Sequence, residues 1–179
     1  AFNIEIFAYY VLNSFSQACT TFVGQNYGAG QIKRCKKILL LCILEDAIAS
    51  AAVISLVLLS GRVLLSVFNS NPEVIEIGYT RLLIILSAYT FSMLYENMSG
   101  YLRGFGDSLI PAVLTVIGIC AVRITWIYTV FQTHRTFTSI MIAYPVSLFT
   151  TALLIFIALM IYRPSRRYAA ANETGSGEI

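Results

Sequence analysis

The sequence predicts an all-α polytopic membrane protein, and two observations carry the prediction. Hydrophobic residues make up 58% of the 179 residues and charged residues only 12%, whereas soluble domains average about 45–50% apolar and about 25% charged residues. The apolar residues also gather into stretches that approach or exceed the about 18 residues of a transmembrane helix, and most lack the polar face of a soluble helix. These five stretches are residues 7–23, 38–60, 78–102, 109–131 and 140–162.

The first two helices are expected over about residues 2–23 and 38–60. The glycine-rich segment 24–30 is expected to break the first helix, because glycine favours turns over helix interiors. The first helix has polar residues on one side at helical spacing, and the second contains two adjacent acids. These residues are Asn13, Gln17, Thr20, Thr21, Glu45 and Asp46. Successive helical positions point about 100° apart, so the two acids cannot both face one site.

The third helix is expected over residues 72–103, and both of its ends carry signals. Asn71 provides a capping side chain, and Pro72 suits the first helical position. The turn that follows has two glycines and then Asp107 or Ser108 to cap the next helix. We therefore expect one long helix between two short turns.

The last two helices are expected over residues 109–131 and 138–162. Pro145 lies inside the fifth helix, where it removes a backbone hydrogen bond and is expected to kink the helix. Together the helices form one transmembrane bundle over residues 1–163. The polar segment 164–179 is expected to be a disordered cytoplasmic tail.

Cationic side chains cluster in alternate loops. Eight lie after the first, third or fifth helix: Lys33, Arg34, Lys36, Lys37, Arg103, Arg163, Arg166 and Arg167. The other loops hold Arg62 and Arg135. Under the positive-inside rule the larger set is cytoplasmic. We expect a multi-pass protein of the plasma membrane (the inner membrane in a bacterium), with the chain start outside and the C-terminus in the cytoplasm.

Glu96 is the first candidate for a functional residue. It lies inside a long apolar stretch, where an ionisable group is costly unless it faces a cavity or a partner. It shares one narrow face of the third helix with Tyr89, Ser92, Ser99 and Arg103. Such a carboxylate can bind a proton, Na⁺ or a cationic ligand. The alternative is a structural hydrogen bond or ion pair between helices.

The other charged and reactive residues do not point to a further functional site. Glu5 and Arg123 lie toward the expected outer side, where reaching the membrane interface is the simpler account of their charge. No nucleophile or metal constellation is visible, so we expect no enzyme and no metal site. The cysteines lack CxxC or Cys/His spacing, and His134 falls in a loop. We expect no cofactor and no nucleic-acid partner.

Three ordered motifs resemble the multidrug and toxic compound extrusion (MATE) family. They are FVGQNYGAGQIKRCKK at 22–37, NSNPEVIEIGYTRLLII at 69–85 and SGYLRGFGDSLIP at 99–111. The resemblance runs from residue 1 to about 163 and corresponds to the last five of the family's twelve helices. The chain also opens on a membrane helix without an initiator methionine, so we expect a fragment of a larger protein.

The resemblance implies an antiporter of two six-helix bundles, of which this chain forms most of one. Such a protein exports organic, often cationic, compounds in exchange for Na⁺ or H⁺, and its partners are the lipid bilayer and its remaining helices. The family commonly places a cation-binding acid at the position of Ser92, whereas this chain has Glu96 one turn later. Its motifs at 24–30 and 102–107 are expected to be cytoplasmic turns.

Within this interpretation the candidate residues fall into two groups. The cation-coupling candidates are Glu96, Ser92, Tyr89 and Asp46. The substrate-cavity candidates are Asn13, Gln17, Ser99 and Tyr95. The alternative function is a flippase for a lipid-linked saccharide. A flippase would favour several cations in the cavity to meet pyrophosphate, but the charges within the helices are mostly acids, with Arg123 the main exception.

Overall fold

A computed structural model describes residues 2–68, 70–133 and 135–164, and all regular structure in these residues is helical. The three long helices at the start are α1 (Phe2–Gly28), α2 (Ile32–Phe68) and α3 (Pro72–Gly104). A broken rod follows, made of α4 (Leu109–Val116), the π-helical turn η1 (Ile117–Ala121), α5 (Val122–Tyr128) and α6 (Val130–Thr133). The chain returns through α7 (Phe137–Tyr162). The expected tail lies outside the described residues apart from Pro164.

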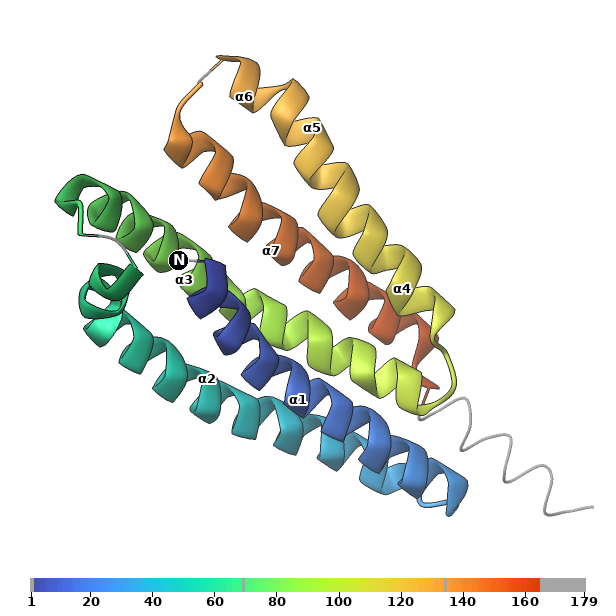
Figure 1. The fold of residues 1–179 in the computed structure, drawn as a ribbon. Helices are drawn as coiled ribbons and strands as arrows, with labels where there is room; N and C mark the ends of the chain where they lie inside the picture. The colour runs from blue at the N-terminus through green and yellow to red at the C-terminus, as the bar shows by residue number, and fades with distance from the viewer. Residues whose placement is uncertain (1, 69, 134, 165–179) are drawn as a thin grey trace, which may run out of the picture.

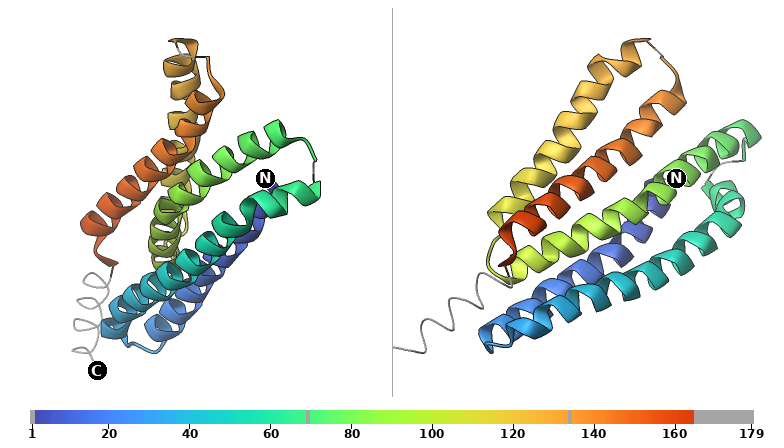
Figure 2. Two further views of the ribbon diagram at one scale, coloured as in Figure 1. Left: turned by 90° about the vertical axis from the view of Figure 1, so that its left-hand side faces the viewer. Right: turned by 180° about the vertical axis from the view of Figure 1, so that it is seen from behind.

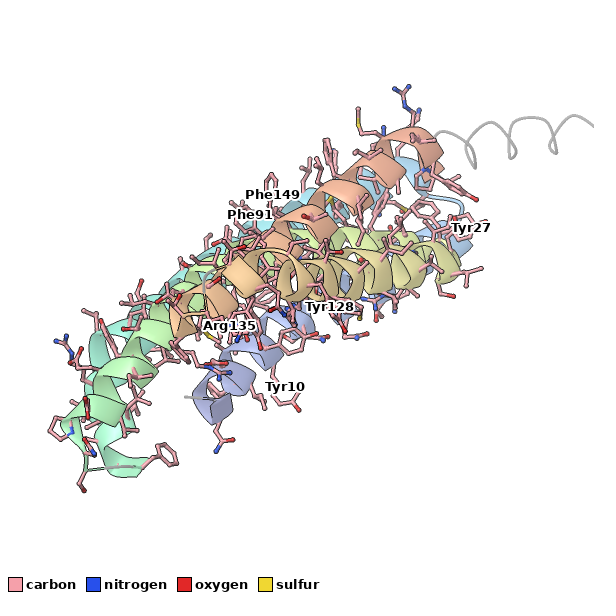
Figure 3. The ribbon with its side chains drawn as sticks, turned by 90° about the horizontal axis from the view of Figure 1, so that it is seen from above. Tyr10, Tyr27, Phe91, Tyr128, Arg135 and Phe149 are labelled. Carbon is pink, nitrogen blue, oxygen red and sulfur yellow. The ribbon has the colours of Figure 1, made fainter. Side chains whose placement is uncertain are left out.

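Helix α3 is the centre of the arrangement. It packs against α1, α2 and α7, while the rod α4–α6 lies along α7 (Figure 1). The group α1–α3 and the pair formed by α7 and the rod come together where α3 turns into α4, and they diverge toward the opposite end (Figure 2). Phe91 of α3 and Phe149 of α7 meet edge to face, with ring centroids 5.3 Å apart (Figure 3).

Four helical segments of the described chain are long and apolar enough to cross a membrane: Ile32–Phe68, Pro72–Gly104, Leu109–Thr133 and Phe137–Tyr162. The fifth expected span, at 7–23, is part of a 27-residue helix but is not among them. Polar residues such as Asn13 and Gln17 interrupt its apolar sequence. The all-helical membrane fold is therefore confirmed, whereas the count of five spans is not.

The first two helices are longer than predicted. Helix α1 continues through Gly24 to Gly28, and the chain turns at Gly30, which has a left-handed backbone with φ +72°. Helix α2 begins at Ile32 and includes the cationic residues that follow it. The prediction counted apolar residues, but a helix continues through polar ones as long as its backbone hydrogen bonds are made.

The ends of α3 follow the sequence signals. The Asn71 side chain accepts a hydrogen bond from the Glu73 backbone N–H at 3.0 Å, and Pro72 begins the helix. After α3, Gly106 adopts φ +91°, a conformation that glycine tolerates without strain. Ser108 precedes α4 but its side chain makes no capping hydrogen bond. The expected cap is thus made at the start of α3 and not by Ser108 at the start of α4.

The main departure from regular α-helix lies in the rod α4–α6 and not at Pro145. Helix α7 is one continuous assignment from Phe137 to Tyr162 with Pro145 inside it. The neighbouring rod instead contains the π turn η1. Gly118 of this turn lies directly against Thr151 of α7, and a Cβ at Gly118 would overlap the Thr151 side chain. The small residue therefore lets the two helices approach closely at this level.

Candidate functional site

The interface of α1 and α3 holds a polar network centred on Glu96. Glu96 is buried, with 8% of its surface exposed. The Tyr9 hydroxyl donates a hydrogen bond to Glu96 Oε1 at 3.0 Å, and Arg103 Nη2 lies 3.9 Å from Glu96 Oε2. At an effective dielectric constant of about 20, unit charges about 4 Å apart attract by about 4 kcal/mol. Arg103 therefore offsets much of the cost of a buried carboxylate.

Ser16 ties this network to the backbone. Arg103 Nη2 donates to Ser16 Oγ at 2.8 Å, and Ser16 Oγ donates to the Glu96 carbonyl oxygen at 2.8 Å. The two helices can come this close because position 100 is glycine. A Cβ at Gly100 would lie 2.5 Å from the Ser16 carbonyl oxygen. Arg103 thus links the Glu96 side chain to a close α1–α3 contact.

A line of hydrogen bonds runs along α1 to Glu96. Gln17 Nε2 donates to Asn13 Oδ1 at 3.3 Å, and Asn13 Nδ2 donates to the Tyr9 hydroxyl at 3.1 Å. Tyr9 in turn donates to Glu96. The line joins exposed Gln17 to the buried carboxylate, because positions four residues apart lie on one helix face. Two of the predicted substrate-cavity residues therefore connect to Glu96.

Glu96 opens into a cavity of 210 Å³ between α3 and the start of α4, which we call the inner cavity. Its lining comprises Tyr95, Glu96, Ser99, Arg103, Ser108, Pro111, Ala112 and Thr115. Ser99 Oγ and Arg103 Nε are buried and have no hydrogen-bond partner among the described residues. A buried polar group without a partner costs about 1–3 kcal/mol, so the inner cavity suits water or another polar guest.

A second cavity of 280 Å³, the outer cavity, lies between α1, α3, α7 and the η1–α5 part of the rod. Its lining comprises Glu5, Ile6, Tyr9, Arg81, Ile85, Tyr89, Ser92, Tyr95, Ile119, Arg123, Tyr144 and Leu148. Tyr89 and Ser92 were expected beside Glu96, but they line this second space. Tyr95 lines both cavities, and Tyr9 links the outer cavity to Glu96 through its hydroxyl.

The charges of the outer cavity are held by specific partners. Arg81 makes a two-pronged ion pair with Glu5, at 2.7 and 2.9 Å. Arg123 Nε donates to Ser147 Oγ at 3.0 Å, and its guanidinium carbon lies 4.2 Å from the centre of the Tyr144 ring. Glu5 and Arg123 therefore do not reach out to the interface as the sequence suggested. Both face the interior of the helix group.

Asp46 lies apart from both cavities, in the contact between α2 and α3. It is fully buried and accepts hydrogen bonds from Ser50 Oγ at 2.9 Å and from Asn97 Nδ2 at 2.5 Å. Glu45, the acid directly before Asp46, is exposed, which confirms that the two acids point to different surroundings. The structure does not bring Asp46 into the Glu96 site.

Sequence reasoning missed Tyr9, Ser16 and Asn97 as members of these networks. Tyr9 could have been found, since it lies four residues before Asn13 and eight before Gln17. Asn97 directly follows Glu96 and so falls on another face of α3. Its contact with Asp46 depends on the packing of α2, which no spacing in the sequence indicates. The described residues contain no group of three or more His, Cys, Asp or Glu side chains that could hold a metal ion.

These features define a multi-pass helical membrane protein in which two buried carboxylates, Glu5 and Glu96, each lie beside an arginine. The chain belongs to the MatE family, whose model matches residues 1–129. This confirms the family that the three sequence motifs resemble. The family consists of transporters and not enzymes, which agrees with the prediction of a protein without enzymatic activity.

Two curated relatives support the assignment. The chain is 28% identical over 122 residues to the probable multidrug resistance protein NorM of Thermotoga maritima, covering 68% of this chain and 26% of NorM. It is 24% identical over 144 residues to the probable multidrug resistance protein YoeA of Bacillus subtilis, covering 80% of this chain and 31% of YoeA. The chain thus spans about a quarter to a third of the length of these relatives.

A solved structure shares the fold. The crystal structure of the eukaryotic MATE transporter AtDTX14 matches with a TM-score of 0.80 at 18% sequence identity. The match covers 94% of this chain and 39% of AtDTX14. At this identity the likeness concerns the fold, and it agrees with the all-helical membrane architecture described above.

Proposed function

We propose that this chain is part of a secondary active antiporter that exports organic, often cationic, compounds in exchange for Na⁺ or H⁺. The observation that carries the proposal is the buried Glu96 carboxylate, which lines the inner cavity together with Ser99 and Arg103 and is held by Tyr9 and Arg103. A transporter of this kind needs a group whose cation occupancy differs between two conformations. Glu96 is the group in the described chain that best meets this need.

Cation binding at Glu96 would change the interactions that hold α1 against α3. A proton or Na⁺ neutralises the carboxylate and so weakens its attraction for Arg103. Arg103 also holds Ser16 of α1, at 2.8 Å. Neutralising Glu96 therefore changes the forces that hold α1 against α3, and a change of this kind can bias the two helices between an open and a closed arrangement.

The other candidate residues take more distant roles in this proposal. Ser99 and Tyr95 line the cavity that Glu96 faces, while Asn13 and Gln17 connect to Glu96 through Tyr9. Tyr89 and Ser92 line the outer cavity, where an organic compound would meet four tyrosine rings. Asp46 stabilises the α2–α3 contact. We propose that α1 completes five spans of a six-helix bundle, with the chain start outside and α7 ending in the cytoplasm.

The flippase alternative rests on the cations of the outer cavity, Arg81 and Arg123. Arg81 already donates hydrogen bonds to both carboxylate oxygens of Glu5. Arg123 is then the cation of this cavity that lacks a carboxylate partner among the described residues. One such cation falls short of the several that a pyrophosphate group would need, so this observation favours the exporter.

The test replaces Glu96 by glutamine in the full-length protein. Glu96→Gln keeps the shape but can neither carry a proton nor neutralise Na⁺, so gradient-driven efflux of ethidium from proteoliposomes should be lost. Tyr9→Phe, which removes the hydroxyl held by Glu96, should reduce efflux without abolishing it. Glu45→Gln, an exposed acid of α2, is the matched control and should transport normally.

Two outcomes would contradict the proposal. Well-folded Glu96→Gln with full ethidium efflux would show that Glu96 is structural. Wild-type protein that moves no dye but translocates a lipid-linked saccharide would support the flippase.

A further inference from the structure

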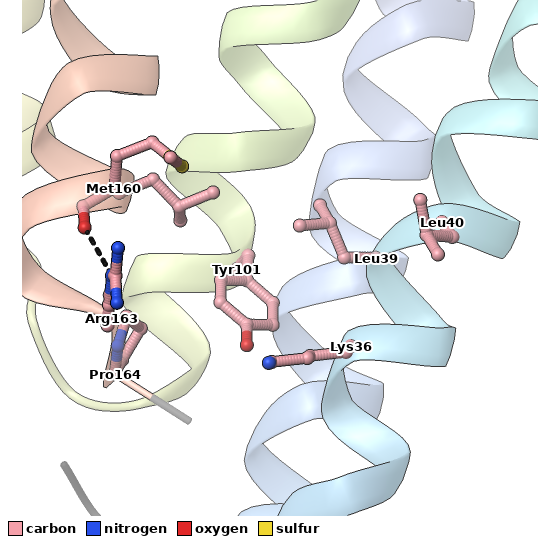
Figure 4. A pocket seen from close by; sticks show the side chains of 8 residues that line it. Lys36, Leu39, Leu40, Tyr101, Met160, Arg163 and Pro164 are labelled. Carbon is pink, nitrogen blue, oxygen red and sulfur yellow. Dashed lines mark hydrogen bonds between the residues drawn. The ribbon is translucent and has the colours of Figure 1, made fainter. Parts of the chain in front are cut away.

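A third cavity lies at the end of the molecule where α2 begins and α3 and α7 end, and we call it the basal groove. Its volume is 390 Å³, larger than that of the inner or the outer cavity, and it takes no part in the Glu96 network. Its lining comprises Lys36, Leu39, Leu40, Tyr101, Leu159, Met160, Arg163 and Pro164 (Figure 4). All three helices contribute to it.

The basal groove combines an apolar wall with a cationic rim. Leucine and methionine side chains from α2 and α7 form the wall, and Lys36 and Arg163 lie at the rim (Figure 4). Arg163 Nε donates to the Met160 carbonyl oxygen at 3.0 Å, and the two terminal nitrogens of its guanidinium make no hydrogen bond to another described residue. Neither Lys36 nor Arg163 forms an ion pair within the part of the chain that the structure describes.

This combination suits an amphiphile with an anionic head. A small inorganic anion would gain nothing from the apolar wall, and a purely apolar molecule would gain nothing from the cations. The wall continues into outward-facing apolar residues of the same helices, with Leu40 67% and Met160 51% exposed. Apolar side chains at this exposure suit contact with lipid chains, and the cations lie where such helices meet the headgroup layer.

We propose that the basal groove binds an anionic phospholipid, with its phosphate between Lys36 and Arg163 and its acyl chains along the apolar wall. The occupant is argued from charge complementarity and from the position of the groove at the ends of three membrane helices. A lipid bound here contacts both α2 and α7, which each pack on α3. It therefore links the two helix groups that diverge at the other end of the molecule.

The experiment uses the full-length protein purified in mild detergent, titrated with phosphatidylglycerol or phosphatidylcholine and monitored by native mass spectrometry. Phosphatidylglycerol should bind the wild type in preference to phosphatidylcholine. A cation near a membrane surface contributes about 1 kcal/mol toward anionic lipid, or about 5-fold in affinity. The double variant Lys36→Gln, Arg163→Gln should therefore bind phosphatidylglycerol about 30-fold more weakly.

The matched control is the double variant Lys33→Gln, Arg34→Gln. Like the test variant it removes two positive charges, here both from the start of α2 at the same end of the molecule, but neither residue lines the groove. All four side chains are exposed, so both variants should fold. The control should bind phosphatidylglycerol within about 2-fold of wild type, and inorganic phosphate should not displace the lipid.

Several results would overturn the proposal. Equal losses in the two double variants would indicate general attraction to the basic end of the molecule. Equal binding of both lipids, or displacement by inorganic phosphate, would show that no anionic lipid is selected. Lipid binding that appears only after the chain is cut following Pro164 would identify the chain's own C-terminal segment as the occupant.

Discussion

The close contact of α1 and α3 at Gly100 can be tested by adding a single methyl group. In Gly100→Ala the new Cβ would lie 2.5 Å from the Ser16 carbonyl oxygen and 3.1 Å from both Ser16 Oγ and Thr20 Oγ1. The first of these atoms is backbone, so a side-chain rotation cannot relieve the overlap. The helices must separate, and the hydrogen bond from Ser16 to the Glu96 carbonyl oxygen is stretched.

The expected loss of stability follows from three contributions. Overpacking of this kind costs about 1–3 kcal/mol, and loss of a typical hydrogen bond costs about 1 kcal/mol. Alanine in a helix interior returns about 0.8–1.0 kcal/mol relative to glycine. The net loss is therefore about 1–3 kcal/mol for Gly100→Ala.

The assay is thermal unfolding of the full-length protein in detergent, followed by intrinsic fluorescence, together with ethidium efflux. Gly24→Ala is the matched control, because its Cβ would lie 3.6 Å from the Gly104 carbonyl oxygen, an ordinary contact distance. Gly24→Ala should raise the melting temperature and Gly100→Ala should lower it. An unchanged or raised melting temperature in Gly100→Ala would refute the close α1–α3 contact and the link from Arg103 to Ser16.

Two further predictions concern Asp46 and the orientation in the membrane. Asp46→Asn should lower the melting temperature, because Asp46 accepts hydrogen bonds from Ser50 and Asn97. It should keep gradient-driven efflux, because Asp46 lines neither the inner nor the outer cavity. Loss of efflux at an unchanged melting temperature would instead indicate that Asp46 binds the coupling cation. In a cysteine-free background, Ser70→Cys should react with an impermeant thiol reagent added outside and Gln31→Cys should not, and the reverse pattern would contradict the positive-inside assignment.

Signals that lie within a few residues of one another predicted the structure well. Asn71 and Pro72 mark the start of α3, and Gly106 marks the turn after it, because capping and turn geometry depend on neighbouring residues. The divergence of Glu45 and Asp46 follows from the helical repeat alone. Such features need no knowledge of what packs against the helix.

The partners of the candidate residues could not be predicted in the same way. The helical repeat places Glu96 on a polar face of α3 but does not say that Tyr9 of α1 lies opposite. That pairing depends on how far α1 slides along α3, which glycine and serine contacts at Gly100 and Ser16 determine. Ser92 and Glu96 line two different cavities, and this separation likewise depends on where Tyr95 and the rod α4–α6 pack.

The π turn η1 determines which way the second half of the fourth rod faces. A π turn accommodates one extra residue relative to an α-helix, and each residue advances an α-helix by about 100°. If the same residues formed a regular α-helix without the π turn, Arg123 would occupy the angular position that Ile124 has now, on a side where Ile124 is 55% exposed. A regular α-helix over these same residues would therefore turn the guanidinium away from Tyr144 and Ser147 and toward the hydrocarbon, whereas deleting one residue from Ile117–Ala121 would remove the π turn and leave Arg123 facing them. The turn acts as a phase correction that allows a charged residue to exist in the middle of this membrane segment.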